Sequence, residues 1–147
     1  HLARGNAIAP HLDGADALVL VNGPDSYISP RWYADRATVP TWDYVALELE
    51  GRVRRMDSDG LEALLHTLIE RNEKRLDGEQ WQASEAPEDY WRKLLGAIVG
   101  FELEIQTWRP TLKLSQTKPE QDRTTIAENL DQTGSPALAH LMRTLAP

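Results

Sequence analysis

The chain has 147 residues, a formal net charge of −7 and no cysteine. Its length fits one domain that can bury a real core, and the lack of cysteine excludes disulfides, thiolate metal sites and cysteine nucleophiles. The acidic balance argues against direct nucleic-acid binding, since a DNA-binding domain normally presents a basic face to phosphates. No apolar run approaches the length of a membrane span and no signal peptide is visible, so we expect a cytoplasmic protein without a membrane partner.

The first part of the chain predicts short strands. Residues 1–6 read as the end of a strand, and residues 7–12 as one helical turn. Residues 17–21 form a continuous apolar run, which is typical of a strand buried on both faces. A further short strand is expected at 26–28.

Residues 23–33 and 39–44 combine aromatic rings with hydroxyl groups and three prolines. Proline fixes φ and removes a backbone donor, so we expect short extended pieces joined by rigid turns rather than a regular helix or a central strand. Such segments hold flat rings and hydroxyls in place, which suits a planar, polar ligand. The alternative is that the rings are packed core with satisfied polar tips, and residue statistics alone favour that alternative.

The middle of the chain changes from a strand pattern to helix patterns. Residues 42–56 show period-two alternation, with Gly51 marking a bend or bulge. Asp59-x-x-Glu62 resembles a capping box, which predicts the start of an amphipathic helix. A second helix is expected from Pro87, because proline is favoured at a first helical position.

The last third predicts a strand, a turn and a return strand, followed by helices. Residues 101–106 alternate strictly, 108–111 read as a turn, and 112–116 as the return strand. A helix is predicted from 118 to about 132, and a short amphipathic helix follows from Pro136. We expect that last helix to pack either on the body of the domain or on a partner chain.

Standard catalytic and metal motifs are absent from the sequence. There is no Gly-x-Gly-x-x-Gly, no phosphate loop ending in Gly-Lys-Ser/Thr and no Gly-x-Ser-x-Gly elbow. The four histidines are scattered, so no metal site is expected. The acid pairs Glu48/Glu50 and Glu102/Glu104 lie on the solvent faces of predicted strands, which favours solubility over acid–base catalysis.

Four blocks of sequence carry a resemblance to a known family. They read "HLARGN", "GPDSYISPRWY", "VPTWDY" and "LKLSQTKPEQDR", in this order from His1 to about Arg123. Together they resemble the PaiB family, described as FMN-binding negative transcriptional regulators. That family is similar to the FMN-binding split barrels, such as pyridoxamine-phosphate oxidases and flavin reductases, which are homodimers with flavin at the subunit interface.

The resemblance implies an α+β fold, a mainly antiparallel β split barrel with peripheral helices. It implies a partial FMN-binding split-barrel domain over residues 1–132. The helix pattern of the last residues predicts a C-terminal helical tail over residues 133–147, which lies outside the resemblance. FMN needs cations or donors for its phosphate, a flat wall for its ring and polar partners for its ribityl chain. The cofactor-binding residues implied by the resemblance are Arg4, Asn6, Ser29, Trp32, Thr41, Trp42, Tyr44, Lys113, Ser115 and Gln116.

Each group of these residues has an implied place. Arg4 and Asn6 are expected near the flavin phosphate or ring edge. The residues expected along the ring or ribityl chain are Ser29, Trp32, Thr41, Trp42 and Tyr44. The three at 113–116 approach from the return strand, in the same or the other subunit. No catalytic residue and no metal ligand are assigned.

The chain also departs from the family pattern. Asp43 stands where the family commonly has asparagine, and its carboxylate would repel a reduced, anionic flavin unless it points elsewhere. Ala7 replaces a proline. The chain begins at His1, inside a predicted strand, so roughly the first third of the family pattern is expected to be missing. The edge left unpaired would then need a partner chain or a reorganised domain.

Three functional hypotheses follow. The leading one is a PaiB-like, FMN-binding regulator that acts as a homodimer. The second is a flavin-dependent oxidoreductase of the split-barrel class, and the third is a structural or interaction module without flavin. Direct DNA binding is the least favoured.

Overall fold

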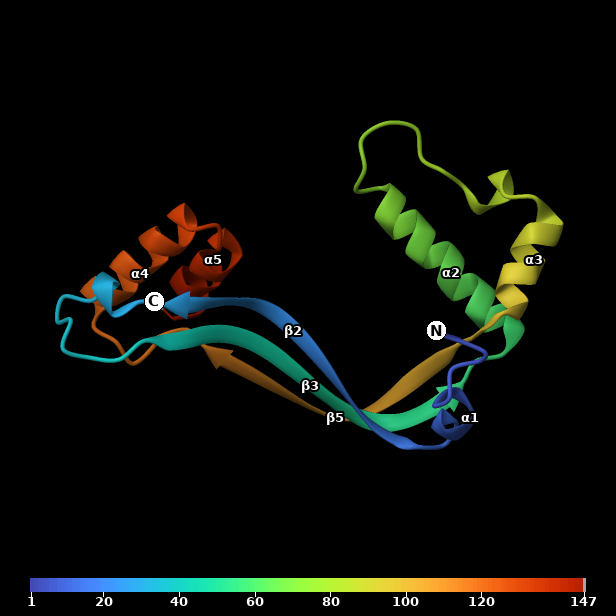
Figure 1. Cartoon of the computed structure of the whole chain (residues 1–147), viewed down its shortest axis with the longest axis horizontal. Coiled ribbons are helices and arrows are strands. Elements are labelled where there is room, and N and C mark those ends of the chain that lie inside the picture. Colours follow the sequence, from blue (N-terminus) through green and yellow to red (C-terminus); the bar gives the residue numbers. More distant parts are fainter. Residues whose placement is uncertain (147) are drawn as a thin grey trace. The chain divides into compact units, whose positions relative to one another are not determined.

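Three long strands form the main sheet of the computed structural model, which describes residues 1–146. They are β2 (Asp16–Ile28), β3 (Thr41–Arg55) and β5 (Phe101–Lys113), paired in the order β2-β3-β5, with neighbours running in opposite directions (Figure 1). A second, two-stranded antiparallel sheet pairs β1 (Leu2–Ala3) with β4 (Ile98–Val99). The predicted α+β class with antiparallel sheets is confirmed, and among residues 1–146 the sheets stay open rather than closing into a barrel.

The chain divides into two compact units, which the long strands pass through. Unit 1 comprises His1–Ala17 and Glu50–Gln106. Unit 2 comprises Leu18–Leu49 and Thr107–Pro147. The sequence predicts another division, with a boundary at residue 132 between a barrel domain and a tail. Pro147, the last residue of that predicted tail, lies outside the described part of the chain.

Unit 1 carries the helices α1 (Ala9–Leu12), α2 (Ser58–Glu73) and α3 (Glu88–Gly96), with a short 3-10 turn at Ala83–Glu85. The capping residue of α2 is Asp57, whose Oδ1 accepts from the Gly60 N–H at 2.7 Å, so the expected cap at Asp59 was two residues too late. Asp59 lies instead in the first turn, where its charge complements the helix dipole.

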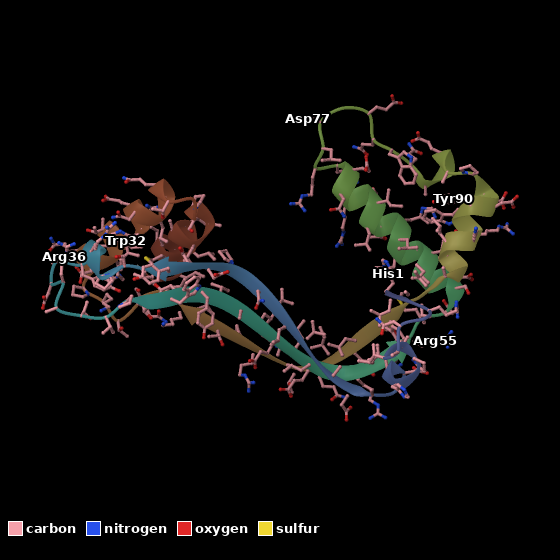
Figure 2. All side chains as sticks on the ribbon, in the orientation of Figure 1. His1, Trp32, Arg36, Arg55, Asp77 and Tyr90 are labelled. Atoms are coloured by element: carbon pink, nitrogen blue, oxygen red, sulfur yellow. The ribbon has the colours of Figure 1, made fainter. Side chains whose placement is uncertain are left out.

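Unit 2 is built around the helices α4 (Glu120–Gln132) and α5 (Pro136–Leu145), which pack against each other beside the end of β2 (Figure 1). Their apolar faces form one buried core with the end of β2 and with Leu114, the residue that follows β5. Trp32, in a 3-10 turn at Pro30–Trp32, packs against this core (Figure 2). The C-terminal helix therefore packs on the body of its own chain. The largest fully buried apolar side chains of this core are Ile28, Leu114, Ile126, Leu130, Leu138 and Met142.

The expectation that residues 39–44 lie outside a central strand is wrong, because Thr41 begins β3, the middle strand of the sheet. Two further strand predictions are wrong, and both concern an edge of the sheet. Residues 17–21 and 26–28 belong to a single strand, β2, and Leu18–Val21 are 42–59% exposed rather than buried on both faces. The predicted turn at 108–111 is absent, because β5 continues through Pro110 to Lys113. Both strands lie at sheet edges, where a proline without an N–H costs no ladder hydrogen bond.

Candidate functional site

The start of β3 presents its side chains to two different surroundings. Because side chains alternate along a strand, Thr41 and Asp43 point to one face and Trp42 and Tyr44 to the other. Asp43 has an exposed fraction of 0%, whereas Trp42 is 51% exposed. The predicted site residues in this segment therefore divide between two pockets of unit 2.

A buried hydrogen bond joins Asp43 to the turn that follows β5. The Ser115 hydroxyl donates to Asp43 Oδ2 at 2.6 Å, and Ser115 adopts a left-handed backbone with φ of 53°. This conformation is uncommon for a residue other than glycine, so the turn is held by its contacts. The other carboxyl oxygen, Asp43 Oδ1, is buried and has no hydrogen-bond partner within residues 1–146.

Two lysines lie beside this carboxyl. The Lys113 ammonium donates to the Thr41 hydroxyl and to the carbonyl oxygen of Trp42, the latter at 2.7 Å. The Lys118 ammonium lies 4.3 Å from the ring centroid of Tyr33, a cation–π geometry. The partners of both ammonium groups are uncharged. Their positive charges are therefore not neutralised by these contacts and can attract an acidic group or an anion.

Tyr33 lies between these groups and the core of unit 2. Its ring is buried in the core of unit 2, and its hydroxyl is buried with no partner in the described chain. Burial, followed by the charges of Asp43 and Asp122, raises the pKa of the Tyr33 phenol. The phenol therefore keeps its proton at neutral pH and remains a free donor.

The pKa of Asp43 is raised as well. Its main cause is burial, which disfavours the charged form, while the Ser115 hydrogen bond and the charges of Lys113 and Lys118 lower the pKa and partly oppose it. Asp43 is therefore a fully buried carboxyl of which only one oxygen has a hydrogen-bond partner in the described chain.

These groups line a pocket of about 440 Å³, which we call the Asp43 pocket. Its volume lies within the range of small-molecule sites. The chemistry is mixed, with two cations, one buried acid, hydroxyl and amide groups, and an apolar rim. The lining residues are Tyr33, Thr38, Val39, Pro40, Thr41, Asp43, Lys113, Ser115, Gln116, Thr117 and Lys118.

A second hollow of unit 2, of about 400 Å³, lies where Trp42 and Tyr44 are presented. The Trp42 indole N–H donates to Asp25 Oδ1 at 2.8 Å, and its ring meets Tyr27 edge-on with centroids 6.2 Å apart. The Asp25 carboxylate and the Tyr27 ring thus fix an indole that remains 51% exposed. We call this surface the Trp42 hollow; Asn22, Gly23, Asp25, Trp42, Tyr44 and Val45 line it.

The structure therefore places the eight predicted residues of unit 2 in three groups. Thr41, Lys113, Ser115 and Gln116 share the Asp43 pocket, and Trp42 and Tyr44 share the Trp42 hollow. Ser29 and Trp32, the third group, have structural contacts within unit 2. Whether any of the ten contacts a flavin stays a prediction. The Ser29 hydroxyl accepts from the Arg31 N–H at 3.3 Å, Trp32 packs on the core, and the Gln116 amide bonds the Leu114 N–H and the Leu112 carbonyl.

The remaining two predicted residues belong to unit 1. The Arg4 guanidinium donates to the carbonyl oxygens of Gly96 at 2.8 Å and Ile98 at 3.2 Å, where it ties the N-terminus to the end of α3 and to β4. The Asn6 side chain accepts from the Ile8 N–H at 3.0 Å. Both side chains thus already have structural partners in their own unit.

Residues that sequence reasoning did not assign complete the Asp43 pocket. Tyr33 and Lys118 fall inside the blocks that carried the resemblance, but neither was singled out. Asp43 was noted only as a departure from the family. The signal that could have found it is the alternation of β3, which puts Asp43 on the same face as Thr41 and opposite Trp42.

Two other kinds of feature are absent from the described residues. In residues 1–146 no group of three or more His, Cys, Asp or Glu side chains is placed to hold a metal ion. Within the same range, every helix is too short or too polar to cross a membrane.

Comparison with known proteins gives the family. Residues 1–107 match the family described as "Putative FMN-binding domain". The chain is 33% identical over 137 residues to the "Protease synthase and sporulation protein PAI 2" of Bacillus subtilis, a match that covers 92% of this chain and 65% of that protein. It is 28% identical to an uncharacterised protein of Emericella nidulans, over 87% of this chain and 58% of that protein. An uncharacterised protein of Saccharomyces cerevisiae is 40% identical over 87 residues, which cover 54% of this chain and 52% of that protein.

The chain thus spans about half to two thirds of the length of these curated relatives. The family match covers more than half of the chain, from its first residue through most of β5. The resemblance carried by the four sequence blocks is confirmed, and the chain belongs to the PaiB-like family whose domain is described as an FMN-binding domain.

Proposed function

We propose that this chain binds FMN and that the Asp43 pocket holds the flavin phosphate. The observation that carries the proposal is the pair of ammonium groups, Lys113 and Lys118, at a pocket that also offers the Thr41 hydroxyl. A phosphate dianion is bound in proteins by cations and by hydroxyl or amide donors. The family membership supports flavin as the molecule that carries this phosphate.

The isoalloxazine ring needs a flat wall, which the Asp43 pocket of one chain supplies only in part. We propose that the exposed indole of Trp42 and the ring of Tyr44 provide this wall for a flavin held by a second copy of the chain. A dimer of this kind accounts for an aromatic surface on the face of β3 opposite to the phosphate pocket. It also gives the exposed apolar side chains of β2 a role.

A negative regulatory role in transcription is part of this proposal, supported by the PaiB resemblance. The net charge of −7 makes direct DNA contact a poor route for it. The chain would then regulate transcription through a protein partner or through the redox state of its bound flavin. A gel shift that appears at low salt and weakens steeply with added salt would contradict this route.

The phosphate assignment is tested by comparing FMN with riboflavin, which lacks the phosphate. Flavin fluorescence quenching on titration with the purified chain gives both affinities. We expect Lys113→Ala and Lys118→Ala each to weaken FMN binding by roughly tenfold, because an ammonium close to a phosphate is worth on the order of 1–3 kcal/mol, and to change riboflavin binding much less.

The matched control is Lys93→Ala. Lys93 is an exposed lysine in the last turn of α3, in unit 1, and it lines none of the pockets described above. Its replacement removes the same charge and should leave both affinities unchanged. An equal loss of FMN and riboflavin binding in the Lys113 and Lys118 variants would contradict the phosphate assignment, and a chain that binds neither flavin would contradict the proposed function.

A further inference from the structure

One group in the Asp43 pocket works against an anionic ligand. Asp43 is the acid in the lining of the pocket, and it shares that lining with Lys113 and Lys118. When its carboxyl is ionised, one negative charge offsets part of the two positive charges. When the carboxyl is neutral, both ammonium charges act on the ligand without this offset.

We propose that Asp43 is the residue that sets the charge preference of this pocket, so that its ionised carboxylate weakens the binding of a phosphate-bearing ligand and its neutral form strengthens it. This inference rests on the proposed function, because it takes the flavin phosphate as the group that occupies the pocket. It adds a specificity-determining residue that the phosphate assignment alone does not need. A ligand without a phosphate should be nearly indifferent to the charge of Asp43.

The geometry supports a carboxyl that changes its charge state above the ordinary range of aspartate. Asp43 is fully buried, Ser115 satisfies one oxygen, and the other oxygen has no partner among residues 1–146. A buried carboxylate with an unpaired oxygen is destabilised relative to its neutral form, and burial accordingly raises the pKa of Asp43.

The other charged and titratable groups around Asp43 come from three parts of unit 2. Lys113 and Lys118, from β5 and the segment after it, lower the pKa of Asp43. Tyr33, from the turn before β3, keeps its proton because its own pKa is raised. Asp122 of α4 acts on Tyr33 and accepts from the Ala34 N–H at 2.8 Å.

The test is Asp43→Asn, which keeps the shape and the acceptor for Ser115 but cannot ionise. FMN and riboflavin affinities of the full chain and of this variant are measured by fluorescence quenching from pH 5 to pH 9. A phosphate monoester itself titrates near pH 6, so the quantity compared is the ratio of the two proteins' affinities at each pH, which cancels the ligand's own titration.

We expect Asp43→Asn to bind FMN about tenfold to a hundredfold more tightly than the unchanged chain at the alkaline end, since charges a few ångströms apart near a protein surface interact by several kcal/mol. The ratio should fall as pH falls, because protonation of Asp43 removes the same negative charge that Asp43→Asn removes at every pH. For riboflavin the ratio should stay near one throughout. The control is Glu48→Gln, which removes one acidic charge from the same strand and unit, at a residue paired with Arg109 and outside the pocket lining, and its ratios should be flat.

A second measurement needs no substitution. Because coupling between sites is reciprocal, FMN binding must raise the pKa of Asp43 if Asp43 ionisation weakens FMN binding. The carboxyl carbon of labelled Asp43, followed by NMR against pH with and without FMN, should titrate at higher pH in the complex, and riboflavin should leave the titration in place.

The outcomes separate this inference from the proposed function. FMN binding that is equal in both proteins at every pH overturns the inference and leaves the proposed function standing. A ratio that rises equally for riboflavin also overturns it, because the effect would then be one of shape rather than charge. If neither protein binds either flavin at any pH, the proposed function falls and the inference falls with it.

Discussion

Burying a carboxyl between Ser115, Lys113 and Lys118 couples the stability of unit 2 to pH, whether or not a ligand is present. The folded chain holds the Asp43 proton to higher pH than the unfolded chain does, because burial raises the pKa above the ordinary value of about 3.9. In the window between these two values the folded state binds more protons, so the free energy of unfolding falls as pH rises. Above the folded pKa the loss is complete and constant.

Asp43→Asn should remove this loss. Its denaturation midpoint should equal that of the unchanged chain well below pH 4 and exceed it increasingly as pH rises through the window, with a slope of at most about 1.4 kcal/mol per pH unit. The measurement is denaturant unfolding followed by tryptophan fluorescence, since Trp32 packs on the core of this unit. Parallel pH profiles for the two proteins would mean that folding does not raise the pKa of Asp43.

At the scale of elements, the contact between β3 and β5 in unit 1 depends on Gly51. A Cβ at this position would lie 2.1 Å from the carbonyl oxygen of Glu104 on β5, a distance that no side chain can occupy. Gly51→Ala must therefore push the two strands apart or unpair them. We expect a loss of about 2–4 kcal/mol in the free energy of unfolding, measured by denaturant titration.

Gly96→Ala is the matched control for this prediction. Gly96 ends α3 in the same unit, has no atom near its Cβ position and needs no positive φ. Alanine there should be neutral or slightly stabilising, because it lowers the entropy of the unfolded chain. A similar loss in both variants would indicate a general cost of the substitution rather than a close approach of β3 and β5.

Element types were largely predictable from sequence, and the errors have physical causes. The alternation of β3 and the apolar stripes of α2 to α5 reflect packing that is local to each element. The turn predicted at Pro110 rests on the rule that proline disfavours strands, but that rule applies to central strands and β5 lies at an edge. The order of strands in a sheet depends on pairings between distant segments, which local patterns do not encode.

The candidate site was predictable to a smaller extent. Thr41, Lys113, Ser115 and Gln116 were selected by resemblance, and the structure brings them to one pocket. Their partners Tyr33 and Lys118 were missed, because a tyrosine whose ring lies under a lysine is recognised only from the tertiary contact. The burial of Asp43 was also hidden, since an aspartate between two aromatic residues reads as surface in sequence.

At the scale of the whole molecule, the exposed apolar side chains of β2 predict self-association. Leu18 and Leu20 are 52% and 59% exposed on an edge strand of unit 2, and soluble proteins rarely leave such contiguous apolar surface uncovered. The double variant Leu18→Lys and Leu20→Lys should shift the chain towards the monomer, measured by sedimentation velocity over a range of concentrations. Leu76→Lys, at a leucine of unit 1 that is 65% exposed, is the control.

The same variant separates the two parts of the proposed flavin site. If the Trp42 hollow of a second copy forms the wall for the ring, the monomer should lose affinity for FMN and for riboflavin by similar factors, because both carry the same ring. The Lys113 and Lys118 variants should instead lose FMN affinity selectively, because only FMN carries the phosphate. A monomeric variant that keeps full affinity for both flavins would place the whole site within one chain and leave Trp42 and Tyr44 without a role in it.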